Sequence, residues 1–200
     1  MADPTTEAYD KIAEEYERTN ANSIWTVHLQ EFKELVSGKR ILEIGCGSGR
    51  DAPNFVDTDY EYVGIDASEN LLKIAQKRLP NHDFRLMDFY NLQFESHFFD
   101  GFLAIASLLH IPKNKIGEVL KSIEGIVKPE GAGFIAMRKG DGEGWRKKNG
   151  NRRYFSFYNA DEFEQILEQS NYSVLKIGEA KEPNGTEWLY FFAKTKNRQS

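Results

Sequence analysis

The chain has one cysteine, Cys46, among its 200 residues. A single cysteine cannot form an internal disulfide or a cysteine-based metal cluster, and this scarcity is typical of proteins of the reducing cytosol. Long apolar runs are missing too, because the run at residues 102–109 is far shorter than the roughly 20 residues of a membrane-spanning helix. The first seven residues lack the basic and apolar regions of a signal peptide. We therefore expect a cytoplasmic protein with no metal and no membrane partner.

The chain also lacks an excess of positive charge, since its net charge is −5. This balance argues against a large electrostatic surface for nucleic acid, although not against a local basic patch. Hydrophobic residues make up 40% and charged residues 28%, which are ordinary values for a globular domain. We expect one domain over residues 1–200, with N-terminal helices at 1–37 that cap the site and a lid-like insertion at 139–158. The oligomeric state stays open.

Three glycines at alternate positions follow a short apolar run in residues 41–50, whose sequence is ILEIGCGSGR. The run predicts a buried parallel strand, and the residues after Gly49 predict the start of a helix. Glycines at such a junction permit a sharp turn and the close approach of a ligand. The lysine that a P-loop needs after its last glycine is missing, and the third glycine comes one residue too early for a dinucleotide site. Glu43 adds a carboxylate at the strand end, which suits a cation better than a pyrophosphate.

This combination resembles the first motif of the class I S-adenosylmethionine (SAM) methyltransferases, E/D-x-G-x-G-x-G, matched by Glu43, Gly45, Gly47 and Gly49. The next expected strand, at residues 60–65, is followed by Asp66, 21 residues after Gly45. An acid at this distance can accept hydrogen bonds from ribose hydroxyls. Asp66 could instead cap the following helix. Next to the glycine motif, we favour ribose binding.

Two further motifs follow in the order that this family has. A third strand is expected at residues 82–87 and ends at Asp88 and Phe89, where the resemblance implies an acceptor for the adenine amino group and a residue packed on the ring. A loop aspartate can also merely stabilise a turn. Residues 98–110 are similar to the fourth motif, in which Asp100 opens a strand. That is the wrong end of a strand for a ligand site, so Asp100 is expected to be structural.

The resemblance implies SAM as the cofactor and S-adenosylhomocysteine (SAH) as its product. The residues expected to bind this cofactor are Tyr16, Glu43, Gly45, Cys46, Gly47, Asp66, Ala67, Asp88, Phe89, Ala104 and Ile105.

The remaining pattern alternates strands and helices, which implies a parallel sheet with right-handed crossovers. The turn at Pro183, Asn184 and Gly185 predicts a hairpin, so the last strand should be antiparallel. The resulting fold class is α/β and Rossmann-like, with a mostly parallel seven-stranded sheet and helices on both faces, as in class I methyltransferases. The other predicted elements are helices at 8–18, 24–36, 51–55, 68–78, 113–127 and 160–169, and strands at 132–138, 172–177 and 187–193.

Substrate residues are expected at the carboxyl ends of the strands and in the added segments. Tyr9 and Tyr16 are seven residues apart and share a helix face, which the resemblance places over the cofactor; equally, both rings could pack that helix onto the core. His110 follows the fourth motif and is a candidate general base, or a residue that lines or caps the pocket. The catalytic candidates are therefore His110 and Tyr16.

The segment after the fifth strand combines cations, aromatic rings and a glycine-rich base. It could be a solvated basic loop, as charge runs usually are. It could also be a flexible lid that grips an anionic aromatic or phosphorylated substrate, or RNA. The cations are Arg146, Lys147, Lys148, Arg152 and Arg153. The residues expected to bind substrate are Ser107, His110, Arg152, Arg153 and Tyr154.

These observations favour a methyltransferase that transfers a methyl group from SAM to a small molecule by in-line displacement, and an anionic or aromatic acceptor is expected. The chain is similar to the small single-domain members of the family, which include small-molecule and tellurite-resistance-like methyltransferases. The Asn/Asp-Pro-Pro-Tyr/Phe motif of nucleic-acid amino-methyltransferases is missing after residue 106. Two alternatives remain: an RNA or protein methyltransferase that uses the basic 146–153 loop, and a non-catalytic SAM-binding module.

Overall fold

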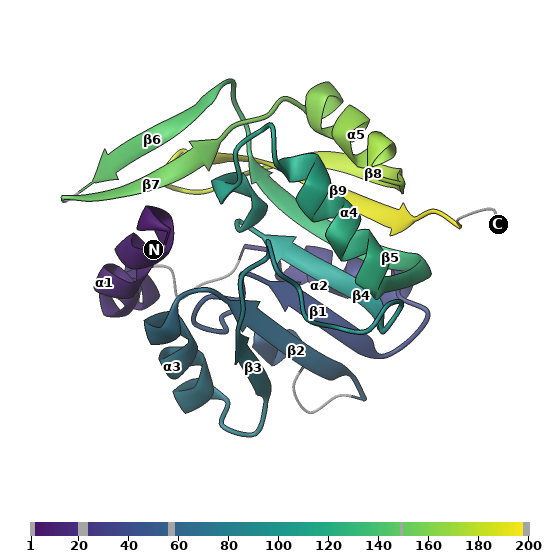
Figure 1. The fold of residues 1–200 in the computed structure, drawn as a ribbon, viewed down its shortest axis with the longest axis horizontal. Helices are drawn as coiled ribbons and strands as arrows, with labels where there is room; N and C mark the ends of the chain where they lie inside the picture. The colour runs from purple at the N-terminus through teal and green to yellow at the C-terminus, as the bar shows by residue number, and fades with distance from the viewer. Residues whose placement is uncertain (1–2, 20–23, 56–58, 149, 198–200) are drawn as a thin grey trace.

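The computed structural model describes residues 3–19, 24–55, 59–148 and 150–197. Its main sheet has seven strands in the order β3-β2-β1-β4-β5-β9-β8, and a separate two-stranded sheet pairs β6 with β7 (Figure 1). The strands are β1 (Arg40–Ile44), β2 (Glu61–Asp66), β3 (Asp83–Leu86), β4 (Phe99–Ile105), β5 (Val127–Arg138), β6 (Glu143–Lys148), β7 (Asn151–Ser156), β8 (Tyr172–Lys181) and β9 (Glu187–Thr195).

Helices cover both faces of this sheet. Figure 1 shows α4 and α5 on the near side and α2 on the far side. The helix α4 buries Ile116, Val119, Leu120 and Ile123, which recur at the spacing of one helix face. None of the described helices is both long and apolar enough to cross a bilayer. The helices are α1 (Pro4–Thr19), α2 (Thr26–Leu35), α3 (Glu69–Arg78), α4 (Ile116–Ile126) and α5 (Ala160–Gln169), with short 3-10 helices η1 (Ala52–Asn54) and η2 (Leu108–His110).

The predicted fold class is confirmed. Strands β1 to β5 are mutually parallel, and β9 is antiparallel to both of its neighbours, β5 and β8. The connection from β8 to β9 is short: Gly185 donates to the Glu182 carbonyl at 2.9 Å and has a φ of 86°. A turn this tight can only reverse the chain, which is why β9 runs against the rest of the sheet.

Two expectations about local structure are wrong. The helix expected at residues 51–55 is only the single 3-10 turn η1, with Pro53 inside it. The segment at 139–158 is not an irregular loop, because β6 and β7 form an antiparallel hairpin whose pairs run from Glu143 with Ser156 to Lys148 with Asn151. Figure 1 shows this hairpin extending past the end of the main sheet, above α1.

The strand order reverses between β1 and β4, which are neighbours in the sheet. In open α/β sheets, the helices that follow two such strands leave toward opposite faces, and a crevice opens at the carboxyl ends of the strands. The glycine motif follows β1 and residues 106–110 follow β4. The fold therefore brings the first and fourth motifs together at this crevice.

Asp100 lies at the opposite, amino end of β4, and its structural role is confirmed. Its Oδ2 accepts from the backbone N–H groups of Lys39 and Arg40, both at 2.9 Å, and its Oδ1 accepts from the Nζ of Lys128 at 2.6 Å. The carboxylate thus fixes the start of β1 against β4 and β5.

We expect Asp100→Ala to lower the free energy of unfolding by about 1–3 kcal/mol, because two N–H groups lose a charged acceptor. Urea denaturation measures this change. Asp83→Ala is the matched control, since Asp83 also starts a strand but pairs only with exposed Arg85, an interaction worth roughly 0–1 kcal/mol. Equal effects of the two variants would contradict the structural role of Asp100.

Candidate active site

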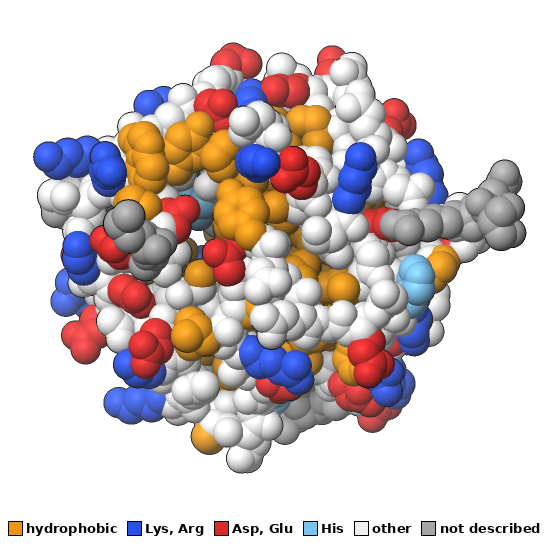
Figure 2. Space-filling view, in the orientation of Figure 1, with side chains coloured by type: hydrophobic (Ala, Val, Ile, Leu, Met, Phe, Trp, Pro, Cys, Tyr) orange, Lys and Arg blue, Asp and Glu red, His pale blue; other side chains and the backbone are white. Residues whose placement is uncertain are grey.

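A cavity opens at the carboxyl ends of β1, β2 and β4 and encloses about 1010 Å³, counting the space open to solvent. Figure 2 shows hydrophobic side chains gathered around a hollow on this side of the molecule. Most of the residues predicted to bind the cofactor line this first cavity. They are Tyr16, Glu43, Gly45, Cys46, Gly47, Asp66, Ala67, Asp88, Phe89 and Ile105. Ala104 is not among the lining residues; it is fully buried within β4.

The glycines of the motif are required by the backbone conformation. Gly45, Gly47 and Gly49 have φ values of 72°, 55° and 70°, which L side chains rarely adopt. A Cβ on Gly45 would lie 2.3 Å from the Cβ of Ser107, so this glycine also allows β1 and β4 to converge. A Cβ on Gly47 would meet no protein atom within 4 Å. The position of Gly47 is therefore open toward the cavity.

Glu43 is a buried carboxylate at the end of β1 and is 2% exposed. Burial raises its pKa to about 8, against the lowering effect of the Tyr62 hydroxyl, which donates to its Oε2. A cation in the cavity would favour the ionised carboxylate, because an opposite charge nearby lowers the pKa of an acid. The first cavity can therefore accommodate a positively charged group next to Glu43.

Asp66 ends β2 and holds the glycine loop. Its Oδ2 accepts from the N–H of Gly47 and its Oδ1 from the N–H of Ser68, both at 2.8 Å. The N-cap of α3 is Ser68, whose side chain accepts from the N–H of Leu71. Asp66 is therefore not the capping residue, and its carboxylate faces the first cavity.

Asp88 and Phe89 follow β3 and line the same cavity. The Oδ1 of Asp88 accepts from the N–H of Tyr90 at 2.8 Å, so the carboxylate also stabilises its own turn. Both interpretations of Asp88 are compatible with this arrangement, since its second oxygen remains available to a ligand.

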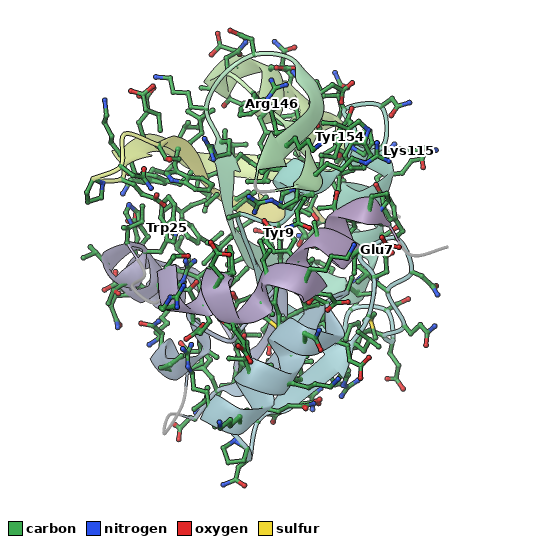
Figure 3. All side chains as sticks on the ribbon, turned by 90° about the vertical axis from the view of Figure 1, so that its left-hand side faces the viewer. Glu7, Tyr9, Trp25, Lys115, Arg146 and Tyr154 are labelled. Atoms are coloured by element: carbon green, nitrogen blue, oxygen red, sulfur yellow. The ribbon has the colours of Figure 1, made fainter. Side chains whose placement is uncertain are left out.

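The helix α1 covers the cavity and is attached to α3. The Oδ1 of Asp10 accepts from the hydroxyl of Ser68 at 2.6 Å and from the N–H of Asn70 at 3.0 Å. Tyr9 and Tyr16 lie edge to face, with ring centroids 5.3 Å apart, and both line the cavity. Figure 3 shows Tyr9 on α1 in the space beneath the hairpin.

His110 is held in one tautomer by two hydrogen bonds. Its Nδ1 lies 2.6 Å from the carbonyl oxygen of Tyr154, which can only accept, so Nδ1 carries the proton. Burial lowers the pKa of His110 to about 4, so the imidazole is neutral at neutral pH. Its Nε2 therefore accepts, and the hydroxyl of Tyr9, 2.9 Å away, donates to it. The contact between Tyr9 and His110 joins residues 101 positions apart and was not anticipated from the sequence.

The fold is shared with solved methyltransferase structures. The DhpI–SAH complex superposes with a TM-score of 0.79 at 19% identity, covering 98% of this chain and 97% of that one. The 1,6-didemethyltoxoflavin-N1-methyltransferase of Burkholderia thailandensis gives 0.67 at 19% identity, covering 98% and 92%. At these identities the likeness concerns the fold alone.

Sequence relatives agree with the motifs. Residues 41–131 match the family model of a methyltransferase domain. The demethylmenaquinone methyltransferase of Renibacterium salmoninarum is 26% identical over 136 residues, which cover 64% of this chain and 56% of that protein. O-methyltransferase rstn1 of Aspergillus nomiae is 24% identical over 173 residues, covering 80% and 76%. Together these findings support a class I SAM-dependent methyltransferase, with the methyltransferase domain matched over residues 41–131.

The chain spans about half the length of three demethylmenaquinone methyltransferases that it matches, with 56%, 53% and 52% of their chains covered. The family match at 41–131 contains the glycine motif, Asp66, Asp88 and His110. The N-terminal helices and the β6–β7 hairpin lie outside that segment. These added parts build the second half of the site.

A second cavity lies between α1, the end of β5, the hairpin and the β8–β9 turn, and encloses about 1200 Å³, counting open solvent. Five residues line both cavities: Tyr9, Tyr16, Arg50, Ala106 and His110. Ala106 directly follows β4 and has a φ of 56°, an uncommon conformation for a residue other than glycine. The two cavities therefore meet at the tip of β4 and the inner face of α1.

The hairpin divides its side chains between two faces, as strand alternation requires. Asn151, Arg153 and Phe155 line the second cavity. Arg152 is exposed and lies over the ring of Trp145, 4.7 Å from its centroid, and Tyr154 contacts the same ring.

Among the predicted substrate residues, Ser107 and His110 line the first cavity and Arg153 the second, whereas Arg152 and Tyr154 line neither. Tyr154 contributes its backbone carbonyl to His110 instead of its side chain. Arg146 and Lys147 are exposed as well, and Arg146 lies over the ring of Phe157. Among the cations of this segment whose side chains the structure describes, Arg153 is directed inward and Arg146, Lys147 and Arg152 lie on the outer surface; the side chain of Lys148 lies outside the described part.

Proposed function

We propose that this methyltransferase binds SAM in the first cavity and transfers its methyl group to a small-molecule acceptor in the second. The observation that carries the proposal is the junction of the two cavities at Tyr9, Tyr16, Ala106 and His110. The acceptor is an anionic or aromatic compound, which is supported by the aromatic and arginine side chains around the second cavity.

The residues of the first cavity fit SAM. Glu43 would stabilise its positive charge, Asp66 would accept from the ribose hydroxyls, and Asp88 with Phe89 would hold the adenine. The Oγ of Ser107 is buried and has no hydrogen-bond partner among the described residues, so it is available to a ligand. When bound, SAM supplies an electrophilic methyl group on a sulfonium.

The protein's main task is then to align the acceptor with that methyl group. Positioning of this kind can lower a barrier by about 7–11 kcal/mol. An acceptor that must lose a proton needs a neutral base, and the lone pair of His110 Nε2 is already bound to the hydroxyl of Tyr9. As the new bond forms, the acceptor's proton moves to the Tyr9 oxygen and the Tyr9 proton moves to Nε2.

The two alternatives differ from this proposal in a measurable way. An RNA or protein methyltransferase would engage the exposed cations of the hairpin, and a non-catalytic module would bind SAM without transferring the methyl group. We would incubate the protein with tritiated SAM and a cell extract. Label in the small-molecule fraction supports the proposal, whereas label in RNA or protein, or none at all, contradicts it.

The Asp66→Ala variant should bind SAH about 1–3 kcal/mol more weakly, because the ribose hydroxyls lose a charged acceptor. Calorimetry with SAH measures this loss. The variant also removes the acceptor for the Gly47 N–H, so 2′,3′-dideoxy-SAH serves as the control ligand. The wild-type protein should prefer SAH, and the variant should bind both ligands equally. If the wild-type protein does not distinguish them, Asp66 does not bind the ribose.

A further inference from the structure

We propose that the second cavity binds a planar aromatic acid, and that Arg138 and Arg153 together hold its carboxylate. This inference rests on the proposed function and specifies its acceptor. Arg138 is the last residue of β5 and Arg153 lies in β7, so two distant segments bring their guanidinium groups to one cavity.

Each guanidinium group lies over two aromatic rings. The Cζ of Arg138 is 5.7 and 5.9 Å from the ring centroids of Trp188 and Phe157. The Cζ of Arg153 is 4.9 and 5.5 Å from those of Tyr9 and Phe155. A guanidinium group carries five N–H donors in a planar fork, which matches the two oxygens of a carboxylate.

Neither arginine forms an ion pair with a carboxylate of the described residues within 4.0 Å. Burial lowers the pKa of Arg138, the charge of Glu182 opposes this shift, and the charge of Arg153 adds to it. Two like charges in one partly buried cavity repel each other unless an anion lies between them. The missing charge is what an acidic ligand would supply.

The acids of the second cavity meet this need only in part. The charge of Glu182 acts on Arg138 from beyond ion-pair distance, while its Oε1 accepts from the indole N–H of Trp188 and its Oε2 from the side-chain amide of Asn184. Glu15 lines the cavity from the exposed side of α1.

Aromatic rings form the rest of the wall. Trp25 and Trp188 are 2% and 7% exposed and lie edge to face with centroids 6.1 Å apart, and Tyr9 and Phe155 line the same cavity. Figure 3 shows Tyr9 and Trp25 at one level beneath the hairpin, with Arg146 far above them. Flat apolar walls suit a ring, and the paired arginines suit an acid on that ring.

The test uses protein saturated with SAH and three pairs of probes measured by calorimetry: benzoate with benzamide, salicylate with salicylamide, and 4-hydroxybenzoate with 4-hydroxybenzamide. We expect at least one acid to bind about tenfold or more tightly than its amide, because the charge-assisted hydrogen bonds are lost in the amide. Arg138→Met and Arg153→Met should each remove that preference. Arg152→Met is the matched control and should keep it, since Arg152 points to the other face of β7.

Three results would overturn the inference: amides that bind as well as their acids, Arg152→Met as harmful as Arg153→Met, or phenyl phosphate preferred over every acid. Thermal melts check that the variants fold. Arg153→Lys keeps the positive charge but loses the planar guanidinium group, so it should retain part of the preference for the acid over its amide. SAH binding separates the two proposals. If wild-type protein fails to bind SAH, the proposed function fails; if SAH binds and no acid is preferred, only this inference fails.

Discussion

Gly47→Val is expected to abolish binding of SAM and SAH while the protein stays folded. The φ of 55° is a strained conformation for a β-branched residue, and the new side chain would point into space that only a ligand occupies, since no protein atom lies within 4 Å of its Cβ. We expect the affinity for SAH to fall at least about 100-fold, which corresponds to roughly 3 kcal/mol. Calorimetry measures the affinity, and circular dichroism checks the fold.

Gly185→Val provides a control with the same kind of backbone change. Gly185 has a φ of 86° and its Cβ would also meet nothing within 4 Å, but it lies in the β8–β9 turn and does not line the first cavity. Both variants should lose similar stability, and only Gly47→Val should lose SAH. Normal SAH binding by Gly47→Val would mean that the glycine motif is merely a turn.

The architecture could be predicted because its signals are local. A buried strand followed by alternating glycines, an acid after the next strand and a tight turn at Pro183, Asn184 and Gly185 each act within about ten residues. The alternation of strands and helices implies parallel strands with right-handed crossovers, and the tight turn implies one antiparallel strand. The positions of Glu43 and Asp66 in the first cavity follow from the same local pattern.

The sequence of the hairpin also contains a local strand pattern, but its many cations favoured the interpretation as a basic loop. Residues 151–157 alternate between two faces, with Arg153 and Phe155 on one and Arg152 and Tyr154 on the other. This period of two is typical of a strand. The interpretation of these cations as one basic loop gave Arg152 and Arg153 the same predicted role. Adjacent residues of a strand, however, point in opposite directions.

The second cavity could not be predicted, because its parts come together only in the folded chain. Arg138 ends β5, Trp188 lies in β9, Trp25 precedes α2 and Tyr9 lies in α1. Trp25 and Trp188 carry no motif, and the proximity of all four residues depends on how the N-terminal helices and the hairpin close over the sheet. Two signals were usable: the position of Arg138 at a strand end and the helix face that Tyr9 shares with Tyr16.

Tyr9→Phe is expected to lower kcat about 100-fold and to leave SAH affinity nearly unchanged. The substitution removes the hydroxyl that bonds His110 at 2.9 Å and also accepts from Arg153, while the ring stays edge to face with Tyr16. Loss of a positioned acid–base group typically costs about 10²–10⁴-fold in rate. The assay follows SAH release with the hydroxybenzoates used as probes for the second cavity. Tyr154→Phe is the control, because only its backbone carbonyl contacts His110.

The pH dependence separates a proton-transfer role for this pair from simple packing. Burial lowers the pKa of His110 to about 4, so its Nε2 stays free of a proton as the pH falls through the range where an ordinary histidine, with a pKa of about 6.5, becomes charged. The kcat of the wild-type protein should therefore be flat from about pH 7.5 to about pH 5.5, whereas a base of ordinary pKa would lose about tenfold. Nitrogen NMR of His110, assigned by its loss in His110→Asn, should show the Nδ1–H tautomer throughout that range. A histidine that titrates near pH 6.5, or a Tyr9→Phe variant with wild-type kcat, would contradict proton transfer through Tyr9 and His110.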